Sequence, residues 1–373
     1  MRIGIDARCL CWQRGGVARI LLNLLKLWPR ITDSHRYVLY YDDAVPEDEY
    51  LRHSFFEHRV IQGPRFLVKR RAWAGQLLLP RAIRRDKLDL FFAPYYLAPL
   101  YCPCPKSVVA AWDISYTTHP SHYEFRQALQ MSFISRHSCR KANGVVTCSP
   151  YDGRQIEKYY GVPASRICVL RLAADDKFAP PQDSCRVDAL RSKYHLPKRY
   201  ILAMGVILNR RNTDVLIDAF KEIARDYPDI GLVVAGRNST EPPIDIEGRM
   251  KSLIAEGRGV YIPWVPDDEL ADFYSGAWYY ICTSTVDGEA MMLKEAMRCG
   301  TPVITSPLLE ETVEGHAVIL QDPTSRQQTE AVFRKVITSS EMRNRNAREG
   351  LQWVRTLSWH EVARECLQFL ESR

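Results

Sequence analysis

The 373-residue sequence has no apolar run that approaches the roughly 20 residues needed for a membrane-spanning helix. Its start, MRIGIDARCL, carries an arginine and an aspartate close to the first residue and lacks the apolar core of a signal peptide. These two absences predict a cytoplasmic protein, with any membrane contact made from the inner face of the membrane.

Motifs for metals, redox cofactors and nucleic acids are also missing. Cys102 and Cys104 form a C-x-C pair, but no second cysteine or histidine pair stands at a zinc-like spacing, so we expect no metal. The eleven cysteines are an odd number in a chain without a signal, which indicates reduced thiols. No G-x-G-x-x-G follows a predicted strand, which disfavours a dehydrogenase. No recognised nucleic-acid-binding module is present either.

The residues that are present have the balance of a soluble globular protein. Hydrophobic residues make up 46% and charged residues 25%, and the length is enough for two domains that each bury a core. The formal net charge of +7 suits an anionic ligand or an acidic membrane surface.

Short strand-like runs alternate with longer helical patterns along the whole sequence. The first series of strands is expected at residues 2–7, 36–41, 89–93, 106–112 and 144–149. The second series is expected at residues 200–205, 231–236, 259–264, 278–284, 301–306 and 317–322. This alternation predicts an α/β protein with two doubly wound, Rossmann-like domains facing a central cleft.

A polar, proline-bearing stretch at 178–186 separates the two series and marks the domain boundary. We therefore place the first domain at residues 1–178 and the second at 187–357. The final helix, expected at 360–372, has an apolar stripe of its own, and its residues alone allow it to pack on either domain.

The stretch DGEAMMLKEAMRCGTPVI, residues 287–304, leads from a strand end through a loop into a predicted helix. Ligands of open α/β sheets bind outside the carboxyl ends of strands, and the free amides of a helix start favour phosphate. Gly288 would let the backbone approach a ligand closely. The amides that could face a diphosphate are those of Ala290, Met291 and Met292.

Two acids flank this helix start. Glu295 lies one turn into the helix, where it could accept hydrogen bonds from ribose hydroxyls, and Asp287 on the loop could reach the attached sugar. A surface acid, a turn glycine and ordinary core methionines explain the same spacing equally well.

The stretch resembles the E-x7-E region of the retaining nucleotide-sugar glycosyltransferases of family 4, whose two-domain fold is called GT-B. It keeps the glycine at 288, the second acid at 295, Ala296, Met297 and the run from Cys299 to Ile304. Asp287 stands where the family has glutamate, and Ala290-Met291-Met292 replaces Gly-Leu-Pro.

The likeness extends over nearly the whole chain. Residues 5–25 resemble the family's opening strand and glycine-rich loop, so Gly15 and Gly16 would lie near the donor phosphates, although a Gly-Gly pair alone is more often just a turn. Residues 200–212 resemble a strand followed by a phosphate-binding pair, usually Arg-Lys. Here the pair is Arg210-Arg211, which could neutralise a diphosphate leaving group.

Two further segments resemble family features. Residues 261–277 resemble the loop that holds the nucleotide base through the backbone of Val265 and Pro266. Residues 358–370 resemble the terminal helix that crosses back to the first domain. The resemblance thus makes 1–178 with 358–373 the acceptor domain and 187–357 the donor domain.

Residues 106–120 resemble a strand that in many relatives ends in His-Asp. Trp112 replaces the histidine, whereas Asp113 is kept. The resemblance gives Asp113 a role in binding acceptor or sugar, and a cap on the following turn is the alternative.

A separate basic segment, GPRFLVKRRAWAGQLLLPRAIRRDKLD, spans residues 63–89. Its positive residues are Arg65, Lys69, Arg70, Arg71, Arg81, Arg84, Arg85 and Lys87. They alternate with apolar and aromatic residues, namely Phe66, Leu67, Trp73 and residues 77–79. This mixture predicts a surface for anionic lipid, and a solvated helix face over core leucines is the alternative.

The resemblance implies a retaining glycosyltransferase that moves a hexose, with mannose favoured, from a nucleoside-diphosphate sugar to the hydroxyl of a glycan or lipid-linked acceptor. It implies a role in surface polysaccharide or glycolipid synthesis, and a front-face mechanism that needs no cofactor, metal or covalent nucleophile. The residues that the resemblance makes catalytic are Asp287, Arg210, Arg211 and Asp113.

Two alternatives stay open. A sugar-nucleotide epimerase or hydrolase on the same fold would act on the donor alone. A non-catalytic nucleotide-sugar binding protein is favoured by the departures at Asp287, Trp112 and Met291-Met292.

Overall fold

The structure, a computed structural model, describes residues 1–11, 15–42, 44–63, 74–181, 183 and 185–373. These residues form two compact units, one made of Met1–Leu172 with Ser358–Arg373 and the other of Ala173–Leu357. The division thus comes a few residues before the polar stretch at 178–186. The reason is that Phe178 is fully buried in the second unit, where its ring packs against that of Tyr274.

The first unit contains a seven-stranded sheet in the order β3-β2-β1-β4-β5-β6-β7, and every pairing in it is parallel. Its strands are β1 Arg2–Asp6, β2 Arg36–Tyr41, β3 Phe56–Val60, β4 Leu90–Ala93, β5 Ser107–Ala110, β6 Gly144–Thr147 and β7 Ile167–Val169. In the central register, Ile3 of β1 lies opposite Tyr37 of β2 and Leu90 of β4.

The second unit contains a six-stranded parallel sheet in the order β10-β9-β8-β11-β12-β13. Its strands are β8 Arg199–Met204, β9 Ile230–Ala235, β10 Gly259–Ile262, β11 Tyr279–Cys282, β12 Val303–Thr305 and β13 Val318–Ile319. All six were expected from the sequence, and the α/β prediction is confirmed for both units.

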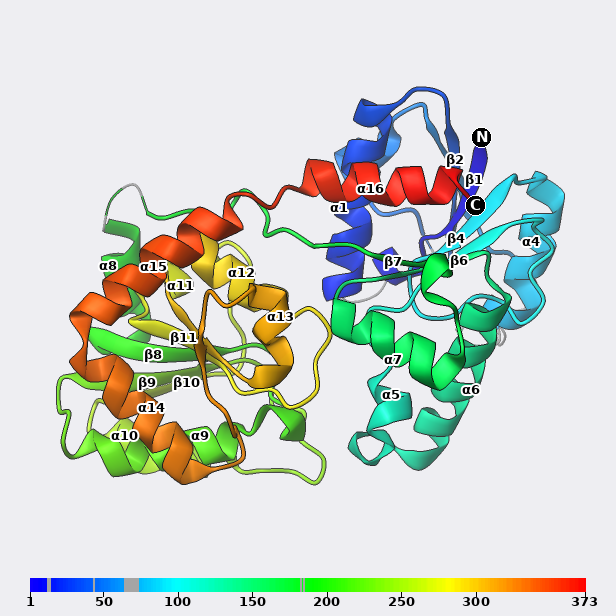
Figure 1. Cartoon of the computed structure of the whole chain (residues 1–373). Helices are drawn as coiled ribbons and strands as arrows, with labels where there is room; N and C mark the ends of the chain where they lie inside the picture. Colours follow the sequence, from blue (N-terminus) through cyan, green and yellow to red (C-terminus); the bar gives the residue numbers. More distant parts are fainter. Residues whose placement is uncertain (12–14, 43, 64–73, 182, 184) are drawn as a thin grey trace. The chain divides into compact units, whose positions relative to one another are not determined.

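Helices cover both faces of the first sheet. They are α1 Gly16–Ile31, α4 Leu79–Asp86, α5 Ser115–Thr118, α6 Phe125–Lys141, α7 Pro150–Tyr160 and α16 Trp359–Glu371. Helices α4, α6 and α7 contribute to one buried cluster with the strands. The terminal helix α16 lies beside α1 (Figure 1), where the indole Nε1 of Trp28 donates to the carbonyl of Ala363 at 3.0 Å.

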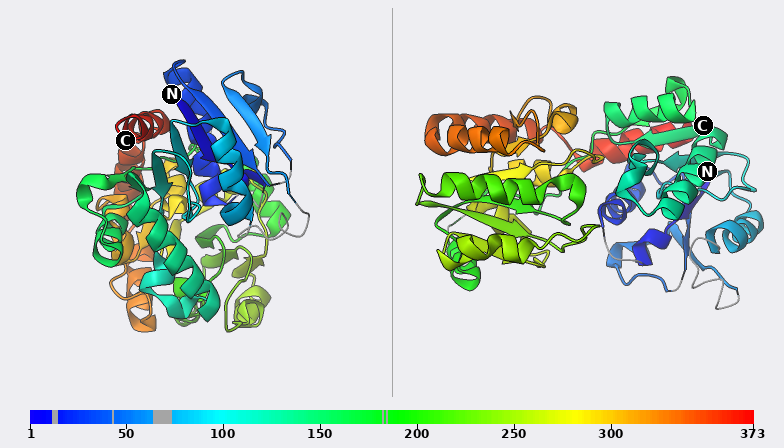
Figure 2. Two further views of the ribbon diagram at one scale, coloured as in Figure 1. Left: turned by 90° about the vertical axis from the view of Figure 1, so that its right-hand side faces the viewer. Right: turned by 90° about the horizontal axis from the view of Figure 1, so that it is seen from below.

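Helices also cover both faces of the second sheet (Figures 1 and 2). Its helices are α8 Cys185–Tyr194, α9 Thr213–Ala224, α10 Ile246–Ala255, α11 Leu270–Gly276, α12 Met291–Arg298, α13 Glu310–Val313, α14 Arg326–Thr338 and α15 Ser340–Val354. Helices α9, α10 and α14 share a buried cluster on one face, through residues such as Phe220, Met250 and Phe333. Helices α12 and α15 lie on the other face (Figure 1).

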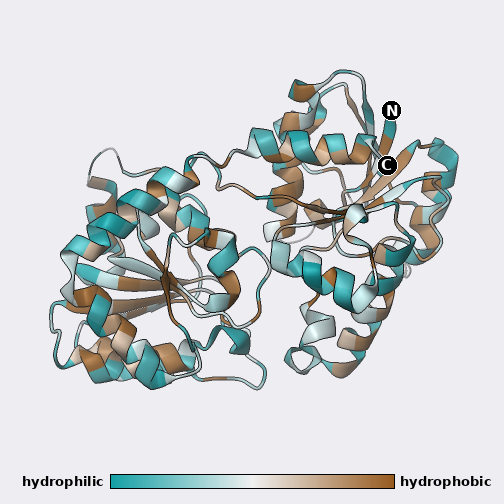
Figure 3. Ribbon diagram, viewed as in Figure 1, coloured by the Kyte–Doolittle hydropathy of each residue, from teal (hydrophilic) through white to brown (hydrophobic). Residues whose placement is uncertain are grey.

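Hydrophobic strands form the middle of each unit, and the helices turn their polar sides outward (Figure 3). Among the described residues, no helix has the length and apolar character that crossing a membrane requires. The same part of the chain holds no group of three or more histidine, cysteine or acidic side chains arranged to hold a metal ion. All eleven cysteines are free thiols.

Candidate functional site

The order of strands in the second unit reverses beside β8. The chain moves outward from β8 through β9 to β10 and then returns to the other side of β8 at β11. Loops that follow such neighbouring strands diverge and leave a place for ligands at their carboxyl ends. The loops concerned begin at Gly205 and Thr283. They carry five of the residues that the sequence singled out, namely Arg210, Arg211, Asp287, Gly288 and Ala290.

The two loops are bonded to each other. The hydroxyl Oγ1 of Thr283 donates to the carbonyl of Arg211, and the amide N–H of Thr285 donates to the carbonyl of Arg210 at 2.8 Å. The side-chain Nδ2 of Asn212 donates to the carbonyl of Thr283, also at 2.8 Å. These bonds fix the backbone of the arginine pair against the loop that leads to Asp287.

Arg211 and Asp287 form an ion pair within this site. The distance from Nη2 of Arg211 to Oδ2 of Asp287 is 3.3 Å, and their side chains are only 15% and 16% exposed. The second oxygen, Oδ1 of Asp287, accepts from the amide of Gly288 at 3.0 Å. Burial lowers the pKa of Arg211, but the Asp287 carboxylate and other neighbours raise it, so the net pKa lies above its ordinary value. Arg211 therefore stays protonated, with Asp287 as its counter-charge.

Gly205 makes room for this guanidinium. Its φ of +128° is a conformation that side-chain-bearing residues rarely adopt. A Cβ at this position would lie 2.3 Å from Nη1 of Arg211 and 2.6 Å from Sδ of Met292. The glycine that ends the strand sequence YILAMG is thus required for the close approach of Arg211.

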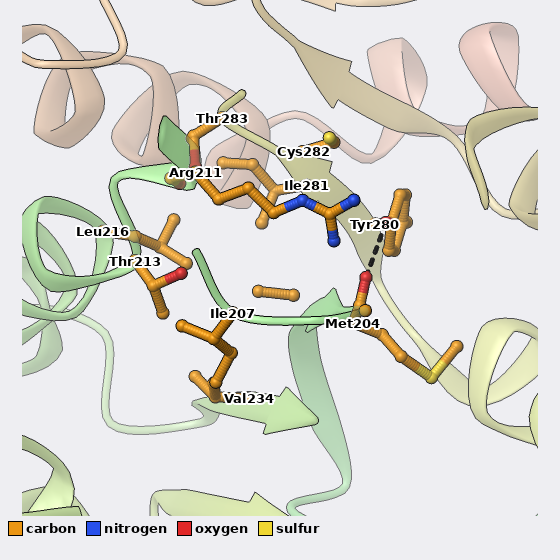
Figure 4. A pocket seen from close by; sticks show the side chains of 12 residues that line it. Met204, Ile207, Arg211, Thr213, Leu216, Val234, Tyr280, Ile281, Cys282 and Thr283 are labelled. Atoms are coloured by element: carbon orange, nitrogen blue, oxygen red, sulfur yellow. Dashed lines mark hydrogen bonds between the residues drawn. The ribbon is translucent and has the colours of Figure 1, made fainter. Parts of the chain in front are cut away.

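A cavity of about 20 Å³ lies behind the guanidinium (Figure 4). Its walls come from β8, β9, β11 and the arginine loop, and the hydroxyl of Tyr280 donates to the carbonyl of Met204 beside it at 2.9 Å. A cavity of this size holds about one water molecule. It is too small for a sugar nucleotide, so a donor would have to meet Arg211 from the solvent side.

Helix α12 begins at this site, one residue later than the sequence suggested. Its N-cap is Ala290, which has left-handed backbone angles, φ 45° and ψ 53°. Such angles cost a non-glycine residue roughly 1–2 kcal/mol. The side chains of Met291 and Met292 are half-buried in the first turn. Next to them, the carboxylate of Glu289 and the ammonium of Lys294 form a buried ion pair.

Glu295 is held inside the unit rather than on its surface. The residue is only 1% exposed, and its Oε2 accepts a hydrogen bond from the hydroxyl of Tyr274 at 3.0 Å. The carbonyl of Tyr274 in turn accepts from Oγ1 of Thr301 at 2.6 Å. Burial raises the pKa of Tyr274 well above its ordinary value, so the phenol stays protonated and donates. Sequence reasoning missed Tyr274, because no local pattern links α11 to α12.

The remaining predicted donor residues lie in both units. Val265 and Pro266 occupy the loop between β10 and α11, where the carbonyl of Pro266 accepts from the amide of Glu269 at 3.1 Å. Gly15 caps the start of α1 in the first unit, and Gly16 is its first residue. Among the residues that the structure describes, none has an atom within 4 Å of a Cβ built on Gly16.

Asp113 also lies in the first unit, where it makes the contacts of a cap. Its Oδ1 accepts from the amide of Ser115 at 2.9 Å and from the hydroxyl of the same residue at 2.5 Å. Its Oδ2 accepts from the hydroxyl of Tyr96 at 3.3 Å. These bonds fit the structural alternative that the sequence left open.

The basic segment at 63–89 is described only in part. Arg65, Phe66, Leu67, Lys69, Arg70, Arg71 and Trp73 lie outside the described residues. On α4, Arg81, Arg84 and Arg85 are exposed, whereas residues 78–79 are buried leucines of the core. The described part therefore combines a solvated basic face with ordinary core packing.

Each of the two units matches a known sequence family. The family described as "Glycosyltransferase Family 4" matches residues 14–178, and the one described as "Glycosyl transferases group 1" matches residues 188–353. The chain belongs to the family-4 glycosyltransferases.

Individual relatives are more distant. The chain is 26% identical to mannosylfructose-phosphate synthase of Agrobacterium fabrum over 69% of this chain and 58% of that protein. It is also 26% identical to O-antigen chain mannosyltransferase B of Escherichia coli, over 79% of this chain and 78% of that protein. The match thus spans little more than half of the first relative.

Solved structures show the same fold. HepE of Anabaena, in complex with UDP and glucose, superposes with a TM-score of 0.75 at 16% identity, over 100% of this chain and 99% of that one. The fold of this family-4 glycosyltransferase is therefore GT-B.

Proposed function

We propose that this family-4 glycosyltransferase moves a hexose, with mannose favoured, from a nucleoside-diphosphate sugar to an acceptor hydroxyl, with retention of configuration. The observation that carries the proposal is the Arg211–Asp287 pair at the reversal of the second sheet. Two of the relatives have names that refer to mannose, and HepE was solved with UDP and glucose. These names support a hexose donor and leave the nucleotide base open.

The reaction needs positive charge where the nucleoside diphosphate departs. In the proposal, Arg211 and its neighbour Arg210 stabilise the leaving diphosphate, together with the first-turn amides of α12 that include Met291 and Met292. Asp287 orients the donor sugar from the loop beside Arg211. Glu295, which Tyr274 already orients, takes a ribose hydroxyl.

The bond changes balance without an added reactant. The bond from the anomeric carbon to the phosphate oxygen breaks, and the acceptor oxygen forms its bond on the same face of the sugar. The acceptor proton passes to the departing phosphate. Arg210 and Arg211 supply the charge that a metal ion would supply in other enzymes, so we expect turnover to continue in EDTA.

The remaining parts of the proposal concern location. Relatives such as O-antigen chain mannosyltransferase B suggest a polysaccharide or lipid-linked acceptor. An acceptor on a lipid carrier would bring the protein to the inner face of a membrane in the cytoplasm. The exposed arginines of α4 suit that anionic surface.

Thermal shift with a panel of nucleotide sugars and free diphosphates tests the donor site. We expect one base to raise the melting temperature of the wild type, and the Arg210→Ala/Arg211→Ala and Glu295→Ala variants to lose that rise. No shift with any of them would refute the site. Binding without glycosyl transfer to any acceptor would instead identify a binding protein, and a changed donor without acceptor would identify an epimerase or hydrolase.

A further inference from the structure

Helix α6 carries a row of large apolar side chains on its solvent side. Phe125, Leu129 and Phe133 are 77%, 62% and 64% exposed. Their spacing of four residues places them on one side of the helix. The opposite side, which includes Ala128 and Ile134, is buried against the first unit. A contiguous row of this kind marks an interaction site more often than scattered apolar residues do.

The same helix is rich in positive charge and holds no acid within its bounds. Its sequence, FRQALQMSFISRHSCRK, contains four basic residues that are all exposed, namely Arg126, Arg136, Arg140 and Lys141. At 3.6 residues per turn, the angular offsets of Arg136 and Arg140 from Phe125 are only about 20° and about 60°. The arginines therefore continue the apolar row. The nearest acid, Glu124, is the N-cap, and its carboxylate accepts from the amide of Gln127.

A neighbouring loop extends this surface toward α4. A ring nitrogen of His137, Nε2, lies 3.1 Å from the carbonyl oxygen of Leu100. Leu100 and Tyr101 are 42% and 63% exposed, and Arg84 of α4 donates to the hydroxyl of Tyr101 at 3.1 Å. We refer to α6 residues 125–140 with Leu100, Tyr101 and Arg84 as the α6 surface.

We propose that the α6 surface docks the protein on an anionic lipid bilayer. The aromatic and leucine side chains would enter the boundary between headgroups and acyl chains, while the arginines stay at the level of the lipid phosphates. This proposal deepens the membrane contact of the proposed function and names the residues that make it. It is independent of the donor chemistry.

Charge decides between lipid and a second copy of the chain. If two copies paired through the apolar row of α6, Arg136 and Arg140 of both copies would lie in the same interface, and like charges in close contact oppose association. An uncharged apolar partner would leave the arginines without counter-charges. An anionic bilayer offers acyl chains to the apolar row and negative headgroups to the arginines at the same time.

Co-sedimentation with vesicles tests the proposal on the full chain. Wild type should bind vesicles of phosphatidylglycerol and phosphatidylcholine and bind pure phosphatidylcholine weakly. The variant Phe125→Ser/Leu129→Ser/Phe133→Ser should bind the anionic vesicles at least tenfold more weakly. The variant Arg136→Gln/Arg140→Gln should bind several-fold more weakly and with a reduced dependence on salt. The matched control is Ile254→Ser on α10, which removes another exposed apolar side chain and should bind as wild type does.

Two measurements keep the test decisive. Circular dichroism and the melting temperature of each variant should match wild type, because the replaced side chains are exposed. Absence of wild-type binding to anionic vesicles, or unchanged binding by the triple variant, would overturn the proposal. Loss of self-association by the triple variant with unchanged vesicle binding would identify a second copy as the occupant and overturn it as well. Nucleotide binding measured by thermal shift should not change, which separates this result from the donor-site test.

Discussion

Replacing Asp287 by asparagine leaves the Arg211 guanidinium without its counter-charge. Asparagine keeps the shape of the side chain, and its oxygen can still accept from the amide of Gly288. The change therefore removes one negative charge, which lies 3.3 Å from a guanidinium that is 15% exposed. Arginine does not lose its proton in proteins, so the cation remains in the variant.

The size of the effect follows from the geometry of the Arg211–Asp287 pair. Two unit charges 3.3 Å apart attract each other by about 5 kcal/mol at an effective dielectric constant of about 20. Part of this lost attraction is offset, because burying an asparagine costs less free energy than burying a carboxylate. We expect a loss of about 2–3 kcal/mol in the free energy of unfolding. For a unit of this size, that lowers the melting temperature by about 4–12 °C.

The assay is calorimetric melting of the full chain, with the transition of the second unit followed in each variant. The matched control is Asp267→Asn, whose partner is Lys177 and whose side chains in the pair are 73% and 38% exposed. Such a surface pair contributes less than about 1 kcal/mol, so this variant should melt close to wild type. A melting temperature for Asp287→Asn as high as that of the control would refute the reasoning.

A double variant identifies the cause of the Asp287→Asn effect. Arg211→Met/Asp287→Asn should be no less stable than Asp287→Asn alone, because the uncompensated charge is gone. If the double variant is instead less stable by the full sum of the two single losses, the pair does not interact in the folded protein.

Three further changes probe the same architecture. Tyr274→Phe removes the donor to Glu295, so unfolding calorimetry should show a loss of about 1.5–3 kcal/mol, with several-fold weaker nucleotide binding. Gly205→Ala combines a positive φ with overlap on Arg211, and urea denaturation should show a loss of about 2–4 kcal/mol. Glu57→Gln should cost about 0.5–1 kcal/mol at pH 7, and this cost should disappear as the pH falls below about 4 in pH-dependent melts.

The sign of the last effect follows from the ion pair. The hydrogen bond from Arg2 is the main reason why the pKa of Glu57 is lowered in the folded state. A lowered pKa gives stability that is complete above the unfolded pKa of about 4.3 and is lost as the pH falls through the folded value. A pH-independent difference between Glu57→Gln and wild type would contradict this account.

Controls for the other two changes lie in the same unit. Tyr200→Phe removes a hydroxyl that donates to the neutral carbonyl of Phe273, so its cost should be about 0.5–1.5 kcal/mol, below that of Tyr274→Phe. Gly257→Ala has a φ of +66° but no atom within 4 Å, so only the strain of about 1 kcal/mol applies. If Tyr274→Phe and Tyr200→Phe lower the free energy of unfolding equally, the hydrogen bond to Glu295 has no special role. The same holds for Gly205 if Gly205→Ala and Gly257→Ala lower it equally.

Most strands could be predicted because buried parallel strands are short apolar runs between turn residues. The two that were missed, β3 with the sequence FEHRV and β7 with ICV, lie at the two edges of the first sheet. Both are largely half-buried edge strands that pair on one side only. In β3 the polar residues Glu57, His58 and Arg59 weaken the apolar pattern, whereas β7 has only three residues and is too short to give one. Helix ends such as those of α7, capped by Ser149 and Gly161, can be read from local sequence, because capping is a local property.

The contacts within the candidate site could not be predicted in the same way. The ion pair joins residues 76 positions apart, and the hydrogen bond from Tyr274 to Glu295 spans 21 positions. Local patterns report on the helix or strand that contains a residue, whereas these contacts depend on which loops and helices the topology brings together. The sequence identified Arg211 and Asp287 as separate candidates but gave no indication that they neutralise each other.

The departures from the family pattern are explained by this same packing. Asp287 is shorter than the family's glutamate, yet its carboxylate still reaches a cation, because Arg211 stands where relatives usually have lysine and offers a forked guanidinium. Ala290 keeps the left-handed angles that suit the family's glycine, and the buried pair of Glu289 and Lys294 stands in the same turn. If the donor diphosphate binds Arg211 as proposed, it competes with Asp287 for the guanidinium, and we expect the strength of this ion pair to affect donor affinity.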